Sequence, residues 1–86
     1  MIFMQVIVYT TTTCPYCKML KDYLESKGTS YVEKLVDQND AARDEMMQAS
    51  GGFLGVPFTV VAKEDGSKST IIGFDKHRVD EVLGFS

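Results

Sequence analysis

The 86-residue sequence predicts an α/β domain in which one mixed four-stranded sheet carries helices on both faces. Two observations predict this fold class. Apolar, β-branched segments and segments of helical spacing follow one another in the order β-α-β-α-β-β-α. Two strands joined by a helix form a parallel pair with a right-handed crossover, whereas a later Asp-Gly turn forms an antiparallel hairpin. We expect residues 1–86 to make a single domain.

The first strand is expected at Gln5–Thr10, an apolar and β-branched segment typical of a strand that is covered on both faces. The first helix is expected from Pro15 to about Lys27, because proline suits the first helical position and Gly28 favours the helix end. Its apolar stripe, which should face the core, comprises Met19, Leu20, Tyr23 and Leu24.

The second strand is expected at Ser30–Val36 and the second helix at Ala41–Ser50. Either Asn39 or Asp40 caps this helix, and the Gly51-Gly52 pair ends it. Its buried side is expected to consist of Ala42, Met46 and Ala49.

A third strand at Phe58–Ala62 leads into the turn Glu64–Ser67 and a fourth strand at about Ser69–Ile72. The last helix is expected at Lys76–Leu83, with Asp75 as its cap. The residues of this helix that should face inward are Val79, Val82 and Leu83.

Composition excludes several classes of function. The formal net charge is −3, and no cluster of lysines and arginines is dense enough to hold a phosphate backbone, so we expect no nucleic-acid partner. The apolar run Met1–Tyr9 has no leading positive charge and is too short to span a bilayer. We therefore interpret it as a strand, and we expect a cytoplasmic monomer without a membrane partner.

The most informative feature is the pair Cys14 and Cys17, which are the only cysteines. In the reducing cytosol a lone cysteine pair is more often catalytic than structural. If Cys14 is the cap of the first helix, the unpaired N–H groups and the helix dipole favour an anion at its sulfur. Cys17 lies one turn on and deeper. We expect thiol–disulfide exchange, in which Cys14 attacks a substrate disulfide and Cys17 resolves the mixed disulfide.

Two neighbouring features leave alternatives open. A zinc site would need four ligands, and His77 is the only further candidate in addition to the cysteines, so we expect no bound metal. Lys18 follows Cys17 directly. Its charge could support the thiolate, or it is an ordinary solvated lysine of the helix.

Two further motifs suggest a binding groove. A cis bond between Val56 and Pro57 would free the N–H and C=O of Val56 for an incoming peptide, whereas a trans proline would only open an edge strand. Gly73 allows a tight turn before the last helix, whose N-terminus could receive a carboxylate. The alternatives are that Asp75 is only a cap and that Phe74 only closes the core.

Three motifs carry a resemblance to the glutaredoxin family along nearly the whole chain: Cys14-Pro15-Tyr16-Cys17, Val56-Pro57 and Gly73-Phe74-Asp75. The resemblance implies a thioredoxin fold, a cis proline and a groove that holds glutathione as reductant. It implies no bound prosthetic group and an indirect use of NADPH through a reductase.

The resemblance also implies roles in the groove. Tyr16 would flank it, the backbone of Val56, beside Pro57, would bind the cysteine of glutathione, and Phe74 and Asp75 would receive the γ-glutamyl end. The sequence departs from the family pattern at three places. Many glutaredoxins have threonine at the position of Gly55, a lysine within the stretch Thr11–Thr13, and two glycines followed by a residue and two aspartates around Gly73.

Three functions are therefore compared. The leading hypothesis is a glutathione-linked oxidoreductase that reduces protein disulfides and protein–glutathione mixed disulfides. Because Gly73-Phe74 is similar to NrdH-type redoxins, the alternative is an electron donor to ribonucleotide reductase that thioredoxin reductase serves. A hypothesis from another class is an iron–sulfur carrier, in which two chains share a cluster through Cys14 and two glutathiones.

Overall fold

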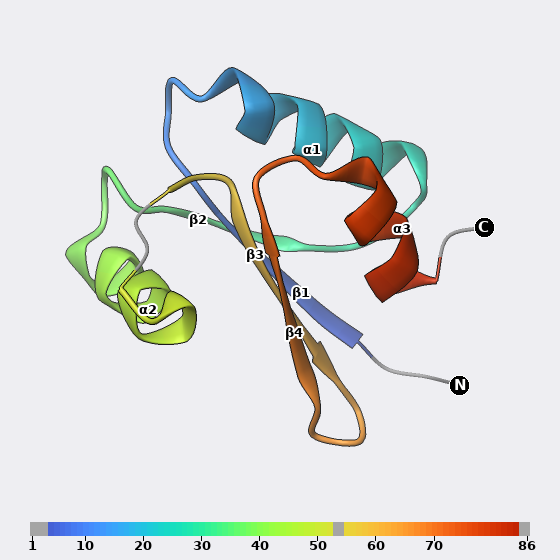
Figure 1. Ribbon diagram of the computed structural model, residues 1–86. Helices are drawn as coiled ribbons and strands as arrows, with labels where there is room; N and C mark the ends of the chain where they lie inside the picture. Colours follow the sequence, from blue (N-terminus) through green and yellow to red (C-terminus); the bar gives the residue numbers. More distant parts are fainter. Residues whose placement is uncertain (1–3, 53–54, 85–86) are drawn as a thin grey trace.

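The computed structural model describes residues 4–52 and 55–84, and these form a four-stranded sheet with helices on both faces (Figure 1). The elements follow in the expected order: β1 (Met4–Thr10), α1 (Pro15–Ser26), β2 (Val32–Leu35), α2 (Asp40–Ser50), β3 (Phe58–Lys63), β4 (Lys68–Ile72) and α3 (Lys76–Leu83). The strand order across the sheet is β2-β1-β3-β4, so β1 and β3 are central.

The strand pairing confirms both topological predictions. β1 and β2 are parallel, with Ile7 opposite Val32, whereas β3 pairs antiparallel with both β1 and β4. β2 is shorter than expected. It begins only at Val32. The chain still folds back on the end of α1 at Thr29, whose N–H donates to the Leu24 carbonyl at 3.0 Å, and the residues from there to Val32 are irregular. The prediction of a strand from Ser30 is therefore wrong at this end.

The helix caps agree with the sequence. Asn39, rather than Asp40, is the N-cap of α2, and its side chain accepts the Ala42 N–H at 3.1 Å. Asp75 caps α3 in the same way. Gly51 ends α2 with φ +72°, a left-handed conformation that a residue with a side chain rarely adopts.

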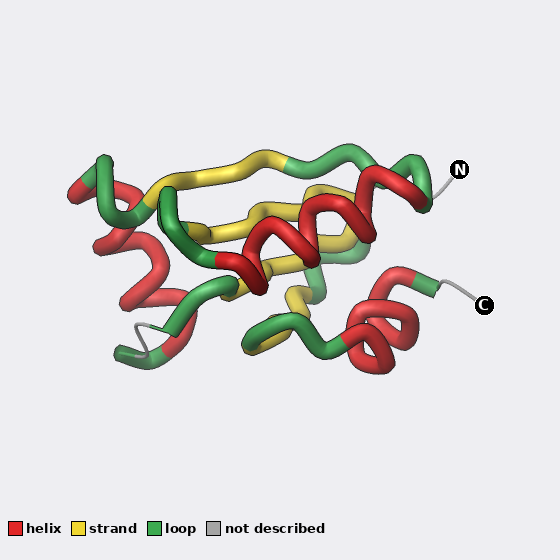
Figure 2. The backbone as a smooth tube through the Cα atoms, turned by 90° about the horizontal axis from the view of Figure 1, so that it is seen from above, coloured by secondary structure: helices red, strands yellow, loops and turns green. Residues whose placement is uncertain are grey.

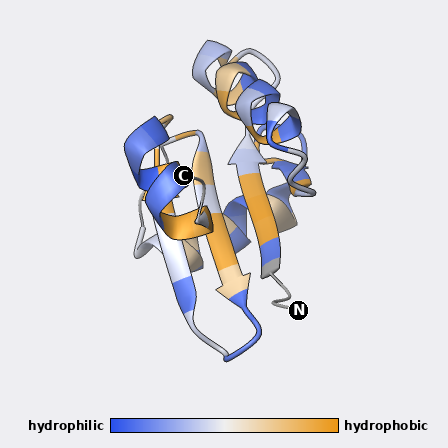
Figure 3. Cartoon of the chain, turned by 90° about the vertical axis from the view of Figure 1, so that its right-hand side faces the viewer, coloured by the Kyte–Doolittle hydropathy of each residue, from blue (hydrophilic) through white to orange (hydrophobic). Residues whose placement is uncertain are grey.

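Two hydrophobic clusters lie on opposite faces of the sheet. One joins α1 and α3 to the strands through residues such as Leu20, Leu24 and Val79, and the other joins Met46 of α2 to Tyr9 and Phe58. Figure 2 shows α1 and α3 on one side and α2 at the opposite side. Figure 3 shows the consequence: hydrophobic colour concentrates in the strands and on the inner faces of the helices.

Two burial predictions are wrong. Met19 is 49% exposed, because the buried ridge of α1 runs through Cys17, Leu20 and Leu24 and leaves Met19 to one side. Ala49 of α2 is also exposed, since the contact of that helix with the sheet rests on Ala42 and Met46.

Candidate active site

The β1–α1 loop, which leads to the first cysteine, is fastened to the β2–α2 turn. Thr12 donates both its backbone N–H and its hydroxyl to Asp37 Oδ2, at 3.1 and 2.7 Å. These two bonds lower the pKa of the Asp37 carboxyl, so it is ionised at neutral pH. The contact fixes the three-threonine stretch immediately before Cys14.

Cys14 is the N-cap of α1, as predicted. Its backbone is extended (φ −97°, ψ 110°), and its sulfur accepts the Cys17 N–H at 3.1 Å. Pro15 occupies the first helical position, where no N–H is needed. The half-buried Cys14 therefore places its sulfur at the N-terminal end of the helix, where backbone N–H groups and the positive end of the helix dipole point.

Cys17 is one turn further along α1 and only 1% exposed. Burial, followed by the neighbouring Cys14 sulfur, raises the pKa of its thiol to about 12, although the Thr11 backbone and the Lys21 charge oppose the shift. Both cysteines are free thiols in this structure. The buried, protonated Cys17 and the accessible Cys14 thus differ in the way that an attacking and a resolving thiol must differ.

The Val56–Pro57 segment lies beside the first thiol. The bond is cis, as expected, Pro57 is fully buried, and Val56 is half-buried. The Cys14 sulfur is 4.0 Å from the Val56 carbonyl oxygen. The Pro57 carbonyl accepts the Gly73 N–H at 2.8 Å, which joins this segment to the turn before α3.

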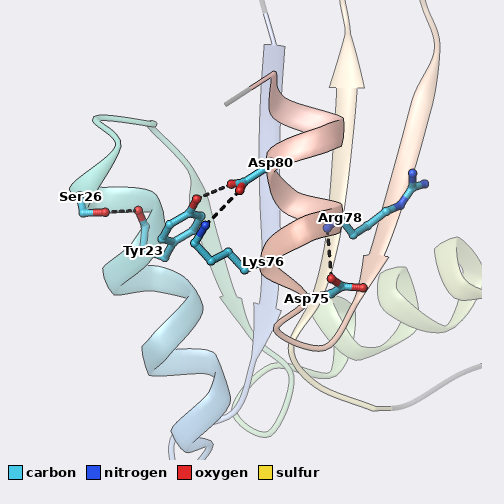
Figure 4. A network of polar contacts seen from close by, with 6 residues as sticks. All are labelled: Tyr23, Ser26, Asp75, Lys76, Arg78 and Asp80. Atoms are coloured by element: carbon cyan, nitrogen blue, oxygen red, sulfur yellow. Dashed lines mark hydrogen bonds and ion pairs between the residues drawn. The ribbon is translucent and has the colours of Figure 1, made fainter. Parts of the chain in front are cut away.

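The other predicted groove residues differ in how far their side chains are available to bind a ligand. Tyr16 is 61% exposed at the start of α1. Phe74 is half-buried against the core, with its ring centroid 6.0 Å from that of Tyr23. Asp75 accepts the Arg78 N–H at 3.1 Å as the α3 cap (Figure 4). A network of Tyr23, Asp80 and Lys76 fastens α1 to α3 (Figure 4).

The structure distinguishes two lysines of α1. Lys18 pairs with Asp22 at 2.9 Å and its side chain is 75% exposed, the arrangement of an ordinary surface lysine. Lys21 pairs with Glu33 at 2.6 Å, and its charge acts on Cys17. Lys21 is not among the site residues predicted from the sequence, although its position four residues after Cys17 places both on one helix face.

An open groove of about 850 Å³ lies beside Cys14, between the start of α1 and β2. Its lining includes Thr11, Lys18, Lys21 and Glu33. This groove is not predictable from the sequence, because it depends on how far α1 lies from the edge strand β2.

Two observations concern metal ligands and membrane-spanning helices. Within residues 4–52 and 55–84, no three potential metal ligands of the His, Cys, Asp or Glu type come together. His77 is exposed on α3. No helix in the described part of the chain is long and apolar enough to cross a bilayer.

A reduced thiol pair at the start of a helix, beside a cis proline and on a thioredoxin fold, defines the class as thiol–disulfide oxidoreductases. A family model described as Glutaredoxin matches residues 6–65. The chain belongs to the glutaredoxin family.

Individual relatives agree with the family assignment. The chain is 38% identical over 76 residues to an uncharacterized glutaredoxin-like 8.6 kDa protein in the rubredoxin operon of Clostridium pasteurianum, covering 88% of this chain and 93% of that protein. It is 50% identical to glutaredoxin 3 of Escherichia coli K12 over 44 residues, about half of each chain (51% and 53%). The crystal structure of the glutaredoxin from Methanosarcina mazei Go1 is similar with a TM-score of 0.75 at 28% identity, covering 94% of this chain and 79% of that one.

Proposed function

We propose that this protein is a glutathione-linked oxidoreductase that reduces protein disulfides and protein–glutathione mixed disulfides. One observation carries the proposal: the Cys14 sulfur lies between the Cys17 N–H at 3.1 Å and the Val56 carbonyl at 4.0 Å. The nucleophile thus stands beside a backbone group that an extended peptide can pair with. We place this activity in the cytoplasm and expect a monomer.

From the protein, the proposed cycle uses only the thiols of Cys14 and Cys17. The Cys14 thiolate attacks one sulfur of the substrate disulfide, and the other sulfur leaves as a thiolate. Cys17 then attacks Cys14, which releases the second substrate sulfur and leaves a Cys14–Cys17 disulfide. Two glutathiones reduce this disulfide and become glutathione disulfide, which an NADPH-dependent reductase reduces in turn.

The glutathione would lie along the segments that meet at Cys14. Exposed Tyr16 flanks the site, and Val56, with Pro57 beneath it, offers backbone groups to the cysteine of the tripeptide. Phe74 and Asp75, immediately before α3, are proposed to receive the γ-glutamyl end, and Gly73 allows the tight turn that precedes them. The hydrogen bond from Gly73 to Pro57, at 2.8 Å, supports this arrangement because it holds the two halves together.

A second candidate is an electron donor of the NrdH type that thioredoxin reductase serves. Two contacts favour it, because they already engage Phe74 and Asp75, two of the residues proposed to bind glutathione. The Phe74 ring packs against Tyr23, and the Asp75 carboxylate already accepts an N–H of its own helix. A 27% identical relative over 81 residues, from Bacillus subtilis, is described as a thioredoxin-like protein.

A paired reductant assay tests the proposal. The oxidised protein is mixed either with glutathione and glutathione reductase, or with thioredoxin reductase, and NADPH loss is followed. We expect consumption with glutathione, and none in the Cys14→Ser variant. Consumption only with thioredoxin reductase selects the second candidate, and none with either reductant contradicts both.

A further inference from the structure

Cys17 must lose its proton before it can resolve the mixed disulfide, and its buried position disfavours the charged thiolate. Cys17 is 1% exposed, and burial, followed by the Cys14 sulfur, raises the pKa of its thiol to about 12. The resolving step nevertheless requires the thiolate, since a thiol is a poor nucleophile. A positive group directed toward Cys17 would therefore set the speed of this step.

Lys21 has the position for this task. It follows Cys17 by four residues on α1, so both side chains lie on the same helix face. Its ammonium pairs with Glu33 of β2 at 2.6 Å, and its side chain is 28% exposed. It is thus held under the helix rather than free in solvent, where its charge would be screened.

Hydrogen bonds and an ion pair through Glu33 hold the Lys21 ammonium in place. The Glu33 oxygen that binds Lys21 also accepts the hydroxyl of Thr10 at 2.7 Å, and Thr10 is fully buried at the end of β1. The Lys21 and Thr10 bonds lower the pKa of the Glu33 carboxyl, so it remains an anion at neutral pH. Lys21 is therefore anchored to β2 and to the end of β1, and it lines the same groove as Cys14.

The groove that Lys21 lines also holds the charged side chains of Lys18, Asp22, Glu25 and Glu33. The groups whose charges act on Cys17 are the Cys14 sulfur and Lys21, and the Thr11 backbone bonds to it as well. Around Lys21, Glu33 and Tyr31 act in addition to Cys17, and burial raises the pKa of Tyr31, which keeps its hydroxyl neutral.

We propose that Lys21, anchored through Glu33 and Thr10, is a positioning residue that stabilises the Cys17 thiolate and so accelerates resolution of the mixed disulfide. In this step the Cys17 sulfur bonds to the Cys14 sulfur, and the bond from Cys14 to the substrate sulfur breaks. The substrate sulfur leaves with the electron pair, and the proton of Cys17 passes to water. The inference rests on the proposed thiol–disulfide exchange.

A chromogenic aromatic disulfide, 5,5′-dithiobis(2-nitrobenzoate), separates the two steps in the full-length reduced protein. Less than one equivalent is added in a stopped-flow instrument. Attack by Cys14 releases the first coloured thiolate, and attack by Cys17 releases the second. Cys17→Ser identifies the second phase, because it should release the first thiolate only.

The expected result is specific for the second phase. Lys21→Gln should slow it by roughly three- to tenfold near neutral pH and shift its pH profile to higher pH, with the first phase unchanged. Lys21→Arg should restore the rate. Lys34→Gln is the matched control and should change neither phase, because Lys34 has a similar exposure (32%) and a glutamate partner at 2.5 Å, but lies on the α2 side of the sheet.

Three outcomes overturn the inference: an unchanged second phase in Lys21→Gln, an equal slowing of both phases, and the same slowing in Lys34→Gln. If Lys21→Gln does not fold, Lys21→Met keeps the aliphatic stem without the charge and is judged by the same criteria. Failure of the proposed function looks different, since the unmodified protein would then lack the first phase or consume no NADPH.

Discussion

Replacing Cys17 with alanine tests whether the resolving thiol is as buried and as weakly acidic as the structure indicates. Burial, followed by the Cys14 sulfur, raises its pKa from 9.0 to about 12. In the unfolded chain the thiol regains its ordinary pKa. Above pH 9 the unfolded chain has therefore lost a proton that the folded chain still holds, so the free energy of unfolding falls as pH rises from 9 toward 12.

The magnitude follows from the two pKa values. A difference of about three units limits the loss to about 4 kcal/mol, which is reached only above pH 12. At about pH 10.5, midway through this window, about 2 kcal/mol is lost. The alanine variant lacks this ionisation, and the cavity left by its missing sulfur does not depend on pH.

Urea unfolding of both proteins, followed by circular dichroism between about pH 8 and 10.5 with excess reductant, measures the effect. Lysines and tyrosines away from Cys17 titrate in both proteins and cancel in the difference. The unmodified protein should lose about 2 kcal/mol relative to Cys17→Ala across this range. A difference in the free energy of unfolding that stays constant with pH would refute the argument that the thiol is buried and protonated.

Three further predictions concern the site. Cys14→Ser should abolish disulfide reduction. Cys17→Ser should accumulate mixed disulfides with protein targets and keep activity on glutathionylated substrates. An equal loss of NADPH consumption in both variants would contradict the division into an attacking and a resolving thiol. Asp75→Asn should raise the KM for glutathione several-fold and leave the thermal stability unchanged, because asparagine still caps α3. Asp75→Ala should raise the KM and also lose about 1 kcal/mol of stability, because the cap is lost. An unchanged KM in both variants would show that Asp75 does not bind glutathione. Anaerobic reconstitution with iron and sulfide should leave a colourless monomer, and a coloured dimer would favour the iron–sulfur carrier instead.

Local sequence chemistry explains why so much of the fold was predictable. Caps and turn residues act over three or four positions, so Asp75, Gly51 and the Asp65-Gly66 turn mark element ends without knowledge of the rest of the chain. The choice between Asn39 and Asp40 needed the structure, because both side chains can cap. The burial of Met19 and Ala49 was mispredicted because it depends on which side of each helix the sheet contacts.

The site residues also fall into those that local sequence predicts and those that only the structure identifies. Cys14 and Cys17 stand in one short motif whose geometry follows from helix capping, so the sequence predicts their different environments. The anchor of Lys21 joins residues from three elements, and Thr12 contacts Asp37 from a loop 25 residues away in sequence. These residue types are common on any protein surface, and only their arrangement in space gives them significance.

The contact of Tyr23 with Asp80 and Lys76 bears on how the molecule receives a small partner. The thiol stands at the start of one helix and Asp75 at the start of another, and this contact joins the two helices beyond those starts. If glutathione binds across both helix ends as proposed, it meets a receptor whose two halves already have their final spacing. Association then sacrifices little of the receptor's own conformational freedom, and most of the entropic penalty falls on the tripeptide.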